Sequence, residues 1–197
     1  VCSSDLSLLD LLVFGRAAGN HIVEHNKQTA FKPLPAGAAD KTIARLDRLD
    51  NATDGEYAQD VANDLRAAMQ HHAGVFRTQA TMDEGVTKIA QLRERVNKIG
   101  LKDKSKVFNT ARIEALEVEN LIESAQATIV SAAARRESRG AHSVNDYGDT
   151  PQNPNGRNDT DWHKHTLWFS EGSRLSYKPV QMKPLTVESV PLTTRTF

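Results

Sequence analysis

One stretch constrains the fold of this 197-residue chain more than any other, the run NTARIEALEVENLIESAQATIVSAAARRESRGAH at residues 109–142. Apolar residues recur in it at spacings of three and four, which places them on one face of an α-helix. These residues are Val118, Ile122, Ala125, Ile129 and Ala132. The pattern predicts a long helix over about residues 109–138 that buries this face against other helices, with Ile122 and Ile129 in the core.

Both ends of this predicted helix carry residues that suit helix termini. Asn109 can act as the N-cap, and Gly140 can end the helix just beyond its last turn. Acidic residues are concentrated in the first half of the run and basic residues in the last turns, an order that the helix macrodipole favours. The basic residues are Arg135, Arg136 and Arg139.

Three shorter apolar patterns precede the long helix, at residues 43–49, 54–72 and 81–97. Asp54 can cap the second of them, and Gly100 can close the third. Short polar loops join the patterns, which favours antiparallel neighbours. The predicted fold is therefore mainly α, an antiparallel three-helix bundle around the long helix. The apolar positions are Ile43, Leu46, Leu49, Val61, Leu65, Ala68, Val86, Ile89, Leu92 and Val96, and His72 shares the face of Val61, Leu65 and Ala68.

The composition of the chain changes after His142. The segment YGDTPQNPNGRNDTD, residues 147–161, is rich in Pro, Gly, Asn and Asp, so we expect a loop without helix there. Two alternating segments then flank Glu171 and Gly172, which predicts a β-hairpin. Residues 143–197 should thus form a loop-rich C-terminal extension with a short hairpin.

The N-terminal part is organised differently. Residues 6–18 are apolar nearly all round, as expected for a helix buried inside a larger domain, and Gly19 followed by Asn20 can end it. Residues 31–39, FKPLPAGAA, read as a linker. We therefore expect three parts: residues 1–35 as the remnant of a larger domain, residues 36–142 as the bundle, and residues 143–197 as the extension.

Composition and motifs name no reaction. Lys plus Arg and Asp plus Glu are 25 each, so no net charge indicates a nucleic acid partner. The histidine pairs His21/His25 and His163/His165 lack a carboxylate or Cys that would complete a ligand set, so we expect no metal site. Phosphate-loop and nucleophile motifs are missing, and we predict no catalytic residue. No apolar run is long enough to span a membrane, which favours a soluble chain.

Several motifs nevertheless resemble a known family. They are SLLDLLVFGRAAG at 7–19, SRGAH at 138–142, and an ending that contains HKHTLWF, LSYKPV, MKPLTVESV and the terminal Arg-Thr-Phe. Together they resemble the C-terminal third of the flavoprotein subunit of succinate dehydrogenase, over residues 7–197. The first two motifs also occur in fumarate reductase and L-aspartate oxidase flavoproteins, so the ending selects the dehydrogenase.

This resemblance implies a parent subunit that holds FAD, oxidises succinate to fumarate and passes electrons to an iron–sulfur subunit on membrane-anchor subunits. Its location would be the cytoplasmic side of a bacterial inner membrane or the matrix side of the mitochondrial one. Ser7 and Leu8 match the family's Ser-Leu pair that contacts the flavin, where N–H groups near a helix start can stabilise negative charge. The rest of the active site is not in this chain, so we expect the chain alone neither to retain FAD nor to be active.

The resemblance breaks off just before Ser7. The family reads Asn-Arg-Leu-Gly-Gly-Asn there and this chain reads VCSSDL, so Cys2 stands where the arginine that binds the substrate carboxylate belongs. A thiol cannot replace a permanently charged, bidentate guanidinium. Our hypothesis is that residues 1–6 are foreign to the family sequence. Arg139 and His142 belong to the shared SRGAH motif, and we interpret them as structural rather than substrate-binding.

The sequence leaves two rival functions open. A fumarate reductase or L-aspartate oxidase flavoprotein would share most of the motifs, and genes for an iron–sulfur subunit and two anchor subunits beside this one would favour the dehydrogenase. The second rival is a stand-alone helical interaction module that never bound FAD. A dinucleotide-binding sequence encoded upstream would exclude it.

Overall fold

The computed structural model describes residues 4–183, 186 and 188–193, with side chains from residue 8 onwards. Cys2 and the terminal Arg-Thr-Phe motif lie outside the described residues. The chain divides into two compact units, Val1–Ala44 and Arg45–Phe197. This division falls within helix α2 (Asp40–Asn51). The three-part division predicted from the sequence, with boundaries after residues 35 and 142, stays a proposal.

The first unit consists of helix α1 (Ser4–Asn26), a linker and the start of α2. α1 continues through Gly19, so the predicted end at this residue is wrong. A single glycine weakens a helix by about 1 kcal/mol but does not stop it. The helix ends instead where the Thr29 hydroxyl donates to the carbonyl of His25, at 3.0 Å. Large apolar side chains of α1 are exposed, namely Leu8, Leu9, Leu11, Leu12, Val13, Phe14, Ile22 and Val23.

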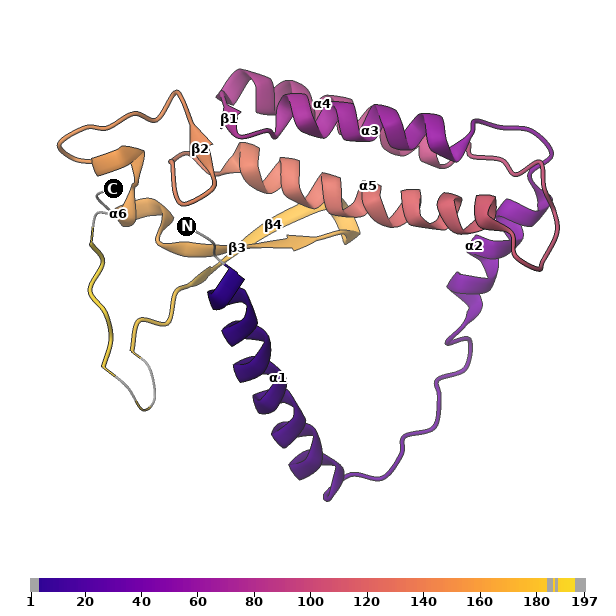
Figure 1. Cartoon of the computed structure of the whole chain (residues 1–197), viewed down its shortest axis with the longest axis horizontal. Coiled ribbons are helices and arrows are strands. Elements are labelled where there is room, and N and C mark those ends of the chain that lie inside the picture. Colours follow the sequence, from indigo (N-terminus) through magenta and orange to yellow (C-terminus); the bar gives the residue numbers. More distant parts are fainter. Residues whose placement is uncertain (1–3, 184–185, 187, 194–197) are drawn as a thin grey trace. The chain divides into compact units, whose positions relative to one another are not determined.

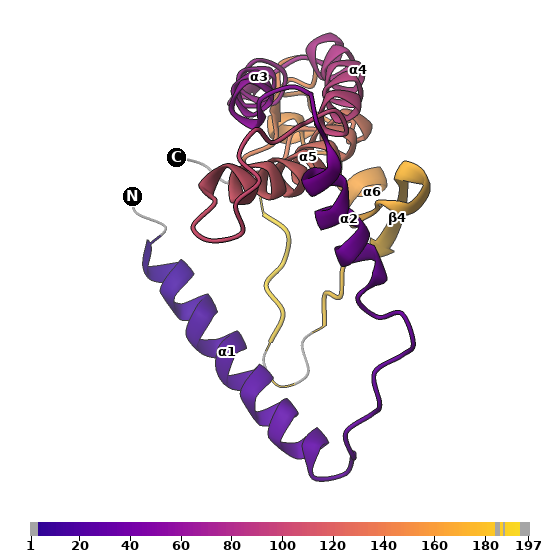
Figure 2. The ribbon, with the colours of Figure 1, turned by 90° about the vertical axis from the view of Figure 1, so that its right-hand side faces the viewer.

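Three helices form the body of the second unit: α3 (Ala58–His72), α4 (Gln79–Val96) and α5 (Thr110–Ala134). They lie side by side in Figure 1, and Figure 2 shows α3 and α4 nearly end-on. The predicted antiparallel three-helix bundle around a long helix is confirmed. Its core includes the whole stripe predicted for α5, with Ile129 fully buried. The other core residues are Leu49, Val61, Leu65, Met82, Ile89, Leu92, Val96, Ile99, Leu101 and Val144 with several alanines.

α5 begins as predicted and ends earlier than predicted. The side chain of Asn109 accepts from the backbone N–H of Arg112 at 2.9 Å, so Asn109 is the N-cap. The helix ends at Ala134, because Arg135 adopts an extended backbone with φ −85° and ψ 105°. The predicted end near residue 138 is therefore wrong. Arg136 and Arg139 lie beyond the helix, where they cannot complement its dipole.

The starts of the two shorter bundle helices differ from each other. The predicted cap of α3, Asp54, is wrong: α3 starts at Ala58, and the Asp54 carboxylate accepts from the N–H of Gly55 instead. α4 starts with a reciprocal capping box between Thr78 and Thr81. Gly85 on α4 permits close packing, because a Cβ there would come within 2.5 Å of the His72 Cβ.

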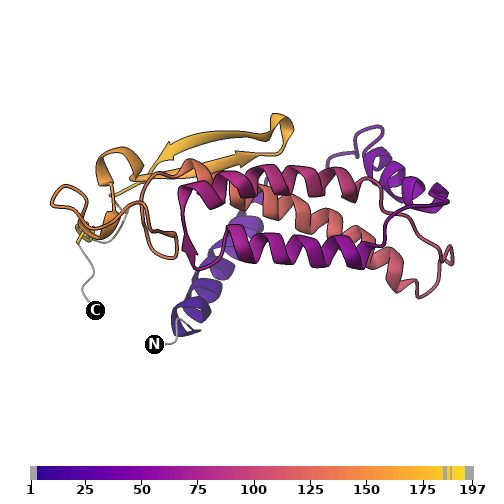
Figure 3. The ribbon, with the colours of Figure 1, turned by 90° about the horizontal axis from the view of Figure 1, so that it is seen from above.

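Two small sheets complete the second unit. Strands β1 (Phe76–Arg77) and β2 (Ser143–Val144) pair in parallel. Strands β3 (Lys164–Phe169) and β4 (Arg174–Pro179) pair antiparallel across a 3₁₀ turn at Glu171–Ser173, so the predicted hairpin is confirmed. Figure 3 shows the hairpin running alongside the bundle, and β3 contacts α5.

The loop between residues 147 and 161 contains more helix than the sequence predicts. Pro154–Gly156 forms a 3₁₀ turn, and α6 (Asp159–Trp162) is one helical turn. The side chain of Asn158 caps α6 by accepting from the N–H of Asp161 at 3.0 Å. The many Asn and Asp residues that favour a loop thus also supply the cap of a short helix.

Candidate functional site

The residues predicted to contact a flavin lie on α1, in the first unit. α1 begins at Ser4, so Ser7 and Leu8 fall within its first two turns rather than at its first residue. The Leu8 side chain is 65% exposed. An exposed apolar side chain beside the N-terminal end of a helix suits one edge of a flat, partly anionic ring system. These residues therefore fit a flavin contact as one edge, and the contact stays a prediction.

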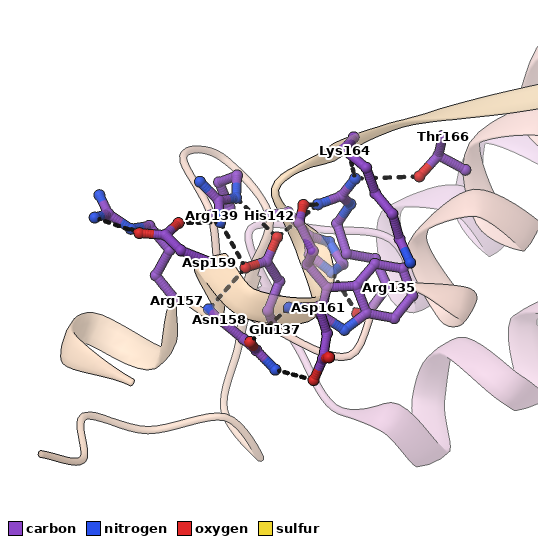
Figure 4. A network of polar contacts seen from close by, with 11 residues as sticks. Arg135, Glu137, Arg139, His142, Arg157, Asn158, Asp159, Asp161, Lys164 and Thr166 are labelled. Carbon is purple, nitrogen blue, oxygen red and sulfur yellow. Dashed lines mark hydrogen bonds and ion pairs between the residues drawn. The ribbon is translucent and has the colours of Figure 1, made fainter. Parts of the chain in front are cut away.

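The most elaborate polar arrangement lies directly after α5, in the second unit. Figure 4 shows it as a network centred on Glu137, which is fully buried. We call it the Glu137 cluster and define it as Arg135, Glu137, Arg139, His142, Arg157, Asn158 and Asp159. It joins the end of the bundle to α6 and to the start of the hairpin.

Four hydrogen bonds reach the carboxylate of Glu137. Arg135 donates to Oε1 at 2.5 Å, and Arg139 donates to Oε1 at 2.8 Å and to Oε2 at 3.0 Å. The backbone N–H of Asn158 donates to Oε2 at 2.8 Å. Burial alone raises the pKa of this carboxyl, but the bonds from Arg139, Asn158 and Arg135 outweigh burial and lower the pKa below 4.5. Glu137 is therefore a buried carboxylate whose negative charge is stabilised by two arginines and a backbone N–H.

A second carboxylate, Asp159, extends the cluster outward. It accepts from Arg139 at 2.6 Å and forms an ion pair with Arg157 at 2.9 Å. Burial raises its pKa, and the hydrogen bond from Arg139 with the charge of Arg157 more than reverses this effect, so the pKa lies below 3.8. Arg139 thus has carboxylates on two sides and is held in one position.

Arg135 connects the cluster to the hairpin. Its guanidinium donates to the carbonyls of Trp162 and Lys164, at 3.0 and 2.7 Å, and to the Thr166 hydroxyl at 3.2 Å. It also lies 5.3 Å from the centre of the Trp162 ring, within range of a cation–π contact. Arg135 makes these bonds from an extended backbone conformation, directly after the last residue of α5.

His142 connects the cluster to strand β1. Arg77 Nη1 lies 3.0 Å from His142 Nδ1, and a guanidinium can only donate, so Nδ1 accepts and Nε2 carries the proton. Nε2 then donates to the Arg135 carbonyl at 3.2 Å. Burial lowers the pKa of His142 below 6.5, and the charges of Arg77 and Arg135 lower it further against the bond to the Arg135 carbonyl. His142 is therefore neutral at ordinary pH.

A hollow of about 700 Å³ opens beside the cluster. Between two of its lining residues, Asn155 and Arg157, Gly156 has a φ of +72° and lies so close to the Tyr147 carbonyl that there is no room for a Cβ. Arg157 closes one side by donating to the Thr193 carbonyl at 2.9 Å. The lining residues are Ser138, Arg139, Gly140, Ala141, Ser143, Pro154, Asn155, Arg157 and Thr193.

The structure brings Arg139 and His142 together in one turn, whereas Ser7 and Leu8 lie on α1 in the first unit. Arg139 and His142 form a two-way backbone pair, with N–H to O distances of 2.8 and 3.1 Å. Their side chains bond to Glu137, Asp159, Arg77 and the Arg135 carbonyl, and the interpretation of both residues as structural stays a prediction. Sequence reasoning missed Glu137, Arg157 and Asp159, although an acid placed between Arg135 and Arg139 is a signal that could have drawn attention to Glu137.

The described residues contain neither a metal centre nor a membrane span. Within them, no group of three or more His, Cys, Asp or Glu side chains could hold a metal ion. Among the described helices, none combines the length and the apolar character needed to cross a membrane.

Known proteins place this architecture in a family. The family model described as fumarate reductase flavoprotein C-term matches residues 62–197. The chain belongs to this family. The succinate dehydrogenase flavoprotein subunit of Coxiella burnetii is 42% identical over 186 residues, which cover 94% of this chain and 30% of the relative. The mitochondrial succinate dehydrogenase [ubiquinone] flavoprotein subunit of Oryza sativa subsp. japonica is 41% identical, covering 97% of this chain and 30% of the relative.

A solved structure of the family agrees with this fold. The structure titled quinol-fumarate reductase with menaquinol molecules has a TM-score of 0.79 and 33% identity, covering 91% of this chain and 31% of its own. This chain therefore spans about a third of the length of the flavoproteins that it matches. The SRGAH motif and the hairpin, which the Glu137 cluster holds together, both lie within the matched range.

Proposed function

We propose that this chain supplies the C-terminal helical part of a succinate dehydrogenase flavoprotein. The observation that carries the proposal is the 42% identity to the Coxiella burnetii subunit over nearly the whole chain. The bundle offers a rigid body, and the Glu137 cluster fixes the SRGAH turn at one end of it. In such a subunit, FAD would supply the two-electron oxidation of succinate to fumarate, and Ser7 and Leu8 would form one edge of its site.

Further subunits follow from this proposal. The electrons would pass to an iron–sulfur subunit held by membrane-anchor subunits, on the cytoplasmic side of a bacterial inner membrane or the matrix side of the mitochondrial one. The chain would act as a scaffold in this assembly, since the described residues offer fixed ion pairs rather than a proton donor aimed at a substrate.

A fumarate reductase is the second candidate, favoured by the description of the matched family and by the quinol-fumarate reductase structure. Both enzymes catalyse the same conversion in opposite directions, so the helical part cannot distinguish them by shape. An L-aspartate oxidase flavoprotein or a free-standing helical module would also accommodate the bundle, but neither would oxidise succinate.

A chimera tests the proposed function. The first two thirds of the Coxiella burnetii flavoprotein would be joined to this chain at Ser7 and produced with the other subunits of that complex. We expect succinate-dependent reduction of an artificial electron acceptor, and a ratio of succinate oxidation to fumarate reduction above one. A chimera that is folded and loaded with flavin but inactive in both directions would contradict the proposal.

The chain by itself should behave differently. Since Ser7 and Leu8 provide only one edge of a flavin site, we expect the purified chain to be colourless and without succinate oxidation. Gel filtration followed by absorbance at flavin wavelengths measures this. Flavin in proportion to the chain would contradict the expectation.

A further inference from the structure

The turn between α3 and α4 is joined to the SRGAH turn by a side-chain contact that depends on the charge of a histidine. The Arg77 guanidinium donates to the carbonyls of Gly74 and Ala73 in its own turn, at 2.8 and 3.1 Å. Its third nitrogen, Nη1, donates to Nδ1 of His142 at 3.0 Å. In the part of the chain that the structure describes, Arg77 forms no ion pair with a carboxylate. A neutral imidazole thus accepts the bond that links this guanidinium to a distant part of the chain.

The backbone beside this contact offers little support to β1. Strands β1 and β2 pair over two residues each, and the N–H of Asn145 donates to the Arg77 carbonyl at 2.8 Å. Two-stranded pairs on their own are only marginally stable in water. On β2, Val144 is buried in the core, whereas Phe76 on β1 is 76% exposed. β2 is therefore fixed by packing, and β1 depends on its few polar contacts.

A proton on His142 changes which of its contacts are possible. The neutral ring accepts from Arg77 at Nδ1 and donates from Nε2 to the Arg135 carbonyl at 3.2 Å. The imidazolium carries an N–H on both nitrogens, so Nδ1 becomes a donor that faces a second, positively charged donor. The bond to Arg77 is then lost, while Nε2 still donates to the carbonyl. Protonation thus frees β1 and leaves His142 bound to the Glu137 cluster.

The charges that face His142 set the direction of the response to pH. Arg77 faces it from β1, and Arg135 and Glu137 face it from the segment after α5, where Arg139 donates to Glu137. Burial lowers the pKa of His142 below 6.5, helped by the charges of Arg77 and Arg135 and opposed by the bond to the Arg135 carbonyl and by Glu137. Once β1 has moved away, His142 binds a proton more tightly. The open form therefore gains population as the pH falls below 6.5.

Contacts on both sides of the turn limit how much of the chain is freed. At the end of α3, Nδ1 of His72 donates to the Thr81 carbonyl at 2.8 Å. At the start of α4, the side chain of Gln79 donates to the Ala133 carbonyl on α5 at 2.9 Å. Neither contact depends on the protonation of His142. The segment that can move is therefore residues 73–77.

We propose that Arg77 and His142 form a proton-operated latch, in which protonation of His142 releases residues 73–77 while the bundle and the Glu137 cluster stay folded. The SRGAH turn on the other side of the latch supplies Ser138, Arg139 and Gly140 to the lining of the hollow. The latch thus links the local pH to the support of one wall of this hollow. The inference concerns contacts within the second unit and does not rest on the proposed function.

Spin labelling tests the latch in the full chain. Cys2→Ser removes the one natural thiol, and Phe76→Cys places a nitroxide label on β1. Electron paramagnetic resonance between pH 8 and about pH 5.5 measures the mobile fraction of the label. We expect this fraction to rise at least about threefold below pH 6.5, and the ratio of open to closed latch to rise at most about tenfold per pH unit, since one proton is taken up. A label at Lys88→Cys, exposed on α4, should keep the same mobility throughout.

Two variants and a matched control separate the latch from a purely structural role of the histidine. His142→Gln keeps an acceptor for Arg77 that does not titrate, so the Phe76 label should stay immobile at every pH. Arg77→Met removes the guanidinium, so the label should be mobile at every pH. His71→Gln makes the same substitution at an exposed histidine of α3 and should respond as the original chain does.

Several results would overturn the inference. They are a Phe76 label of constant mobility in the original chain, a response that persists in His142→Gln, a parallel response at Lys88, and a response that is lost in His71→Gln. Circular dichroism at each pH measures whether the helices of every variant remain folded. If His142→Gln loses helix content, Arg77→Met provides the test instead, and a response to pH that persists without the guanidinium would overturn the inference.

Discussion

α1 and α5 are the two longest helices among the described residues, and they use their apolar residues in opposite ways. α5 has 25 residues and buries one apolar stripe, of which every member is at most 8% exposed, while Ile113 and Leu121 outside the stripe are exposed. α1 has 23 residues and carries large apolar side chains on all sides, with exposed fractions of 53% to 71%. The two helices thus differ in distribution rather than in apolar content.

The difference shows how much of each helix surface must pack against other elements. A stripe can be buried by two neighbouring helices, and α3 and α4 provide them for α5. A helix that is apolar all round requires cover on every side, as in the interior of a large domain. The described part of the first unit offers α1 no such cover, whereas the flavoproteins that this chain matches are about three times as long.

The largest expected effect concerns α1. Exposed contiguous apolar surface promotes association. Burying a few hundred Å² of it between chains contributes several kcal/mol to the free energy of association, at roughly 25 cal/mol per Å². We expect the chain to self-associate at micromolar concentration and the chain without residues 1–30 to be a monomer. Light scattering on both measures the masses. If both chains were monomers, the prediction that α1 needs cover from another surface would be wrong.

The next effect concerns the segment that ends α5. Glu137→Ala removes a buried carboxylate and leaves Arg135 and Arg139 without their main partner, which should cost about 3–5 kcal/mol of unfolding free energy. Urea denaturation of the chain without residues 1–30 measures it. Glu94→Ala is the control, because Glu94 is exposed on α4 and forms no ion pair among the described residues. Similar losses for the two variants would contradict the role of the cluster.

A matched pair of truncations compares the two helices directly. Ile129→Ala creates a cavity in the core of the bundle and should cost about 2–5 kcal/mol. Leu12→Ala on α1 should change the unfolding free energy of the bundle by less than about 0.5 kcal/mol. Denaturant unfolding, monitored through the helix content, measures the unfolding free energy of both variants. A loss below about 0.5 kcal/mol for Ile129→Ala would show the stripe assignment to be wrong.

The smallest effect is a dependence on pH. The pKa of His142 is lowered below 6.5 in the folded chain, so below that pH the unfolded chain takes up the proton first. Stability should therefore be complete above pH 6.5 and decline as the pH falls below it. Glu137 and Asp159 have lowered pKa values and contribute a second loss only below about pH 4.5.

The variant His142→Gln separates these two contributions. We expect it to remove the decline just below pH 6.5 and to leave the decline below pH 4.5 in place. Thermal unfolding between pH 4 and pH 8 measures both. An unchanged profile in the variant would assign the first decline to another group.

Features that depend on residues close together in the chain were predictable from the sequence. The α5 stripe, the Asn109 cap and the hairpin turn are of this kind. The end of α5 was not predictable, because Arg135 leaves the helix to bind carbonyls 27 and 29 residues further along. The cap of α3 failed for a different reason, since Asp54 is engaged with its own neighbour Gly55.

The same distinction between nearby and distant residues applies to the candidate site. A motif identified Arg139 and His142 but could not give their partners, since Asp159 and Arg77 lie 20 and 65 residues away. The burial of Glu137 was not predictable either. A carboxylate between arginines usually lies in solvent, and only the packing of α6 and the hairpin around it removes the water.

The two-residue parallel ladder of β1 and β2 has a consequence for the order of folding. The side-chain contact beside it joins Arg77 and His142, which are 65 residues apart in the chain. The ordering entropy of such a loop is lost before the few ladder bonds form, unless α4 and α5 have already brought the two ends together. We expect this ladder to close last and to open first, so that the amide of Asn145, which donates to the Arg77 carbonyl, exchanges with solvent well before the amides of the bundle.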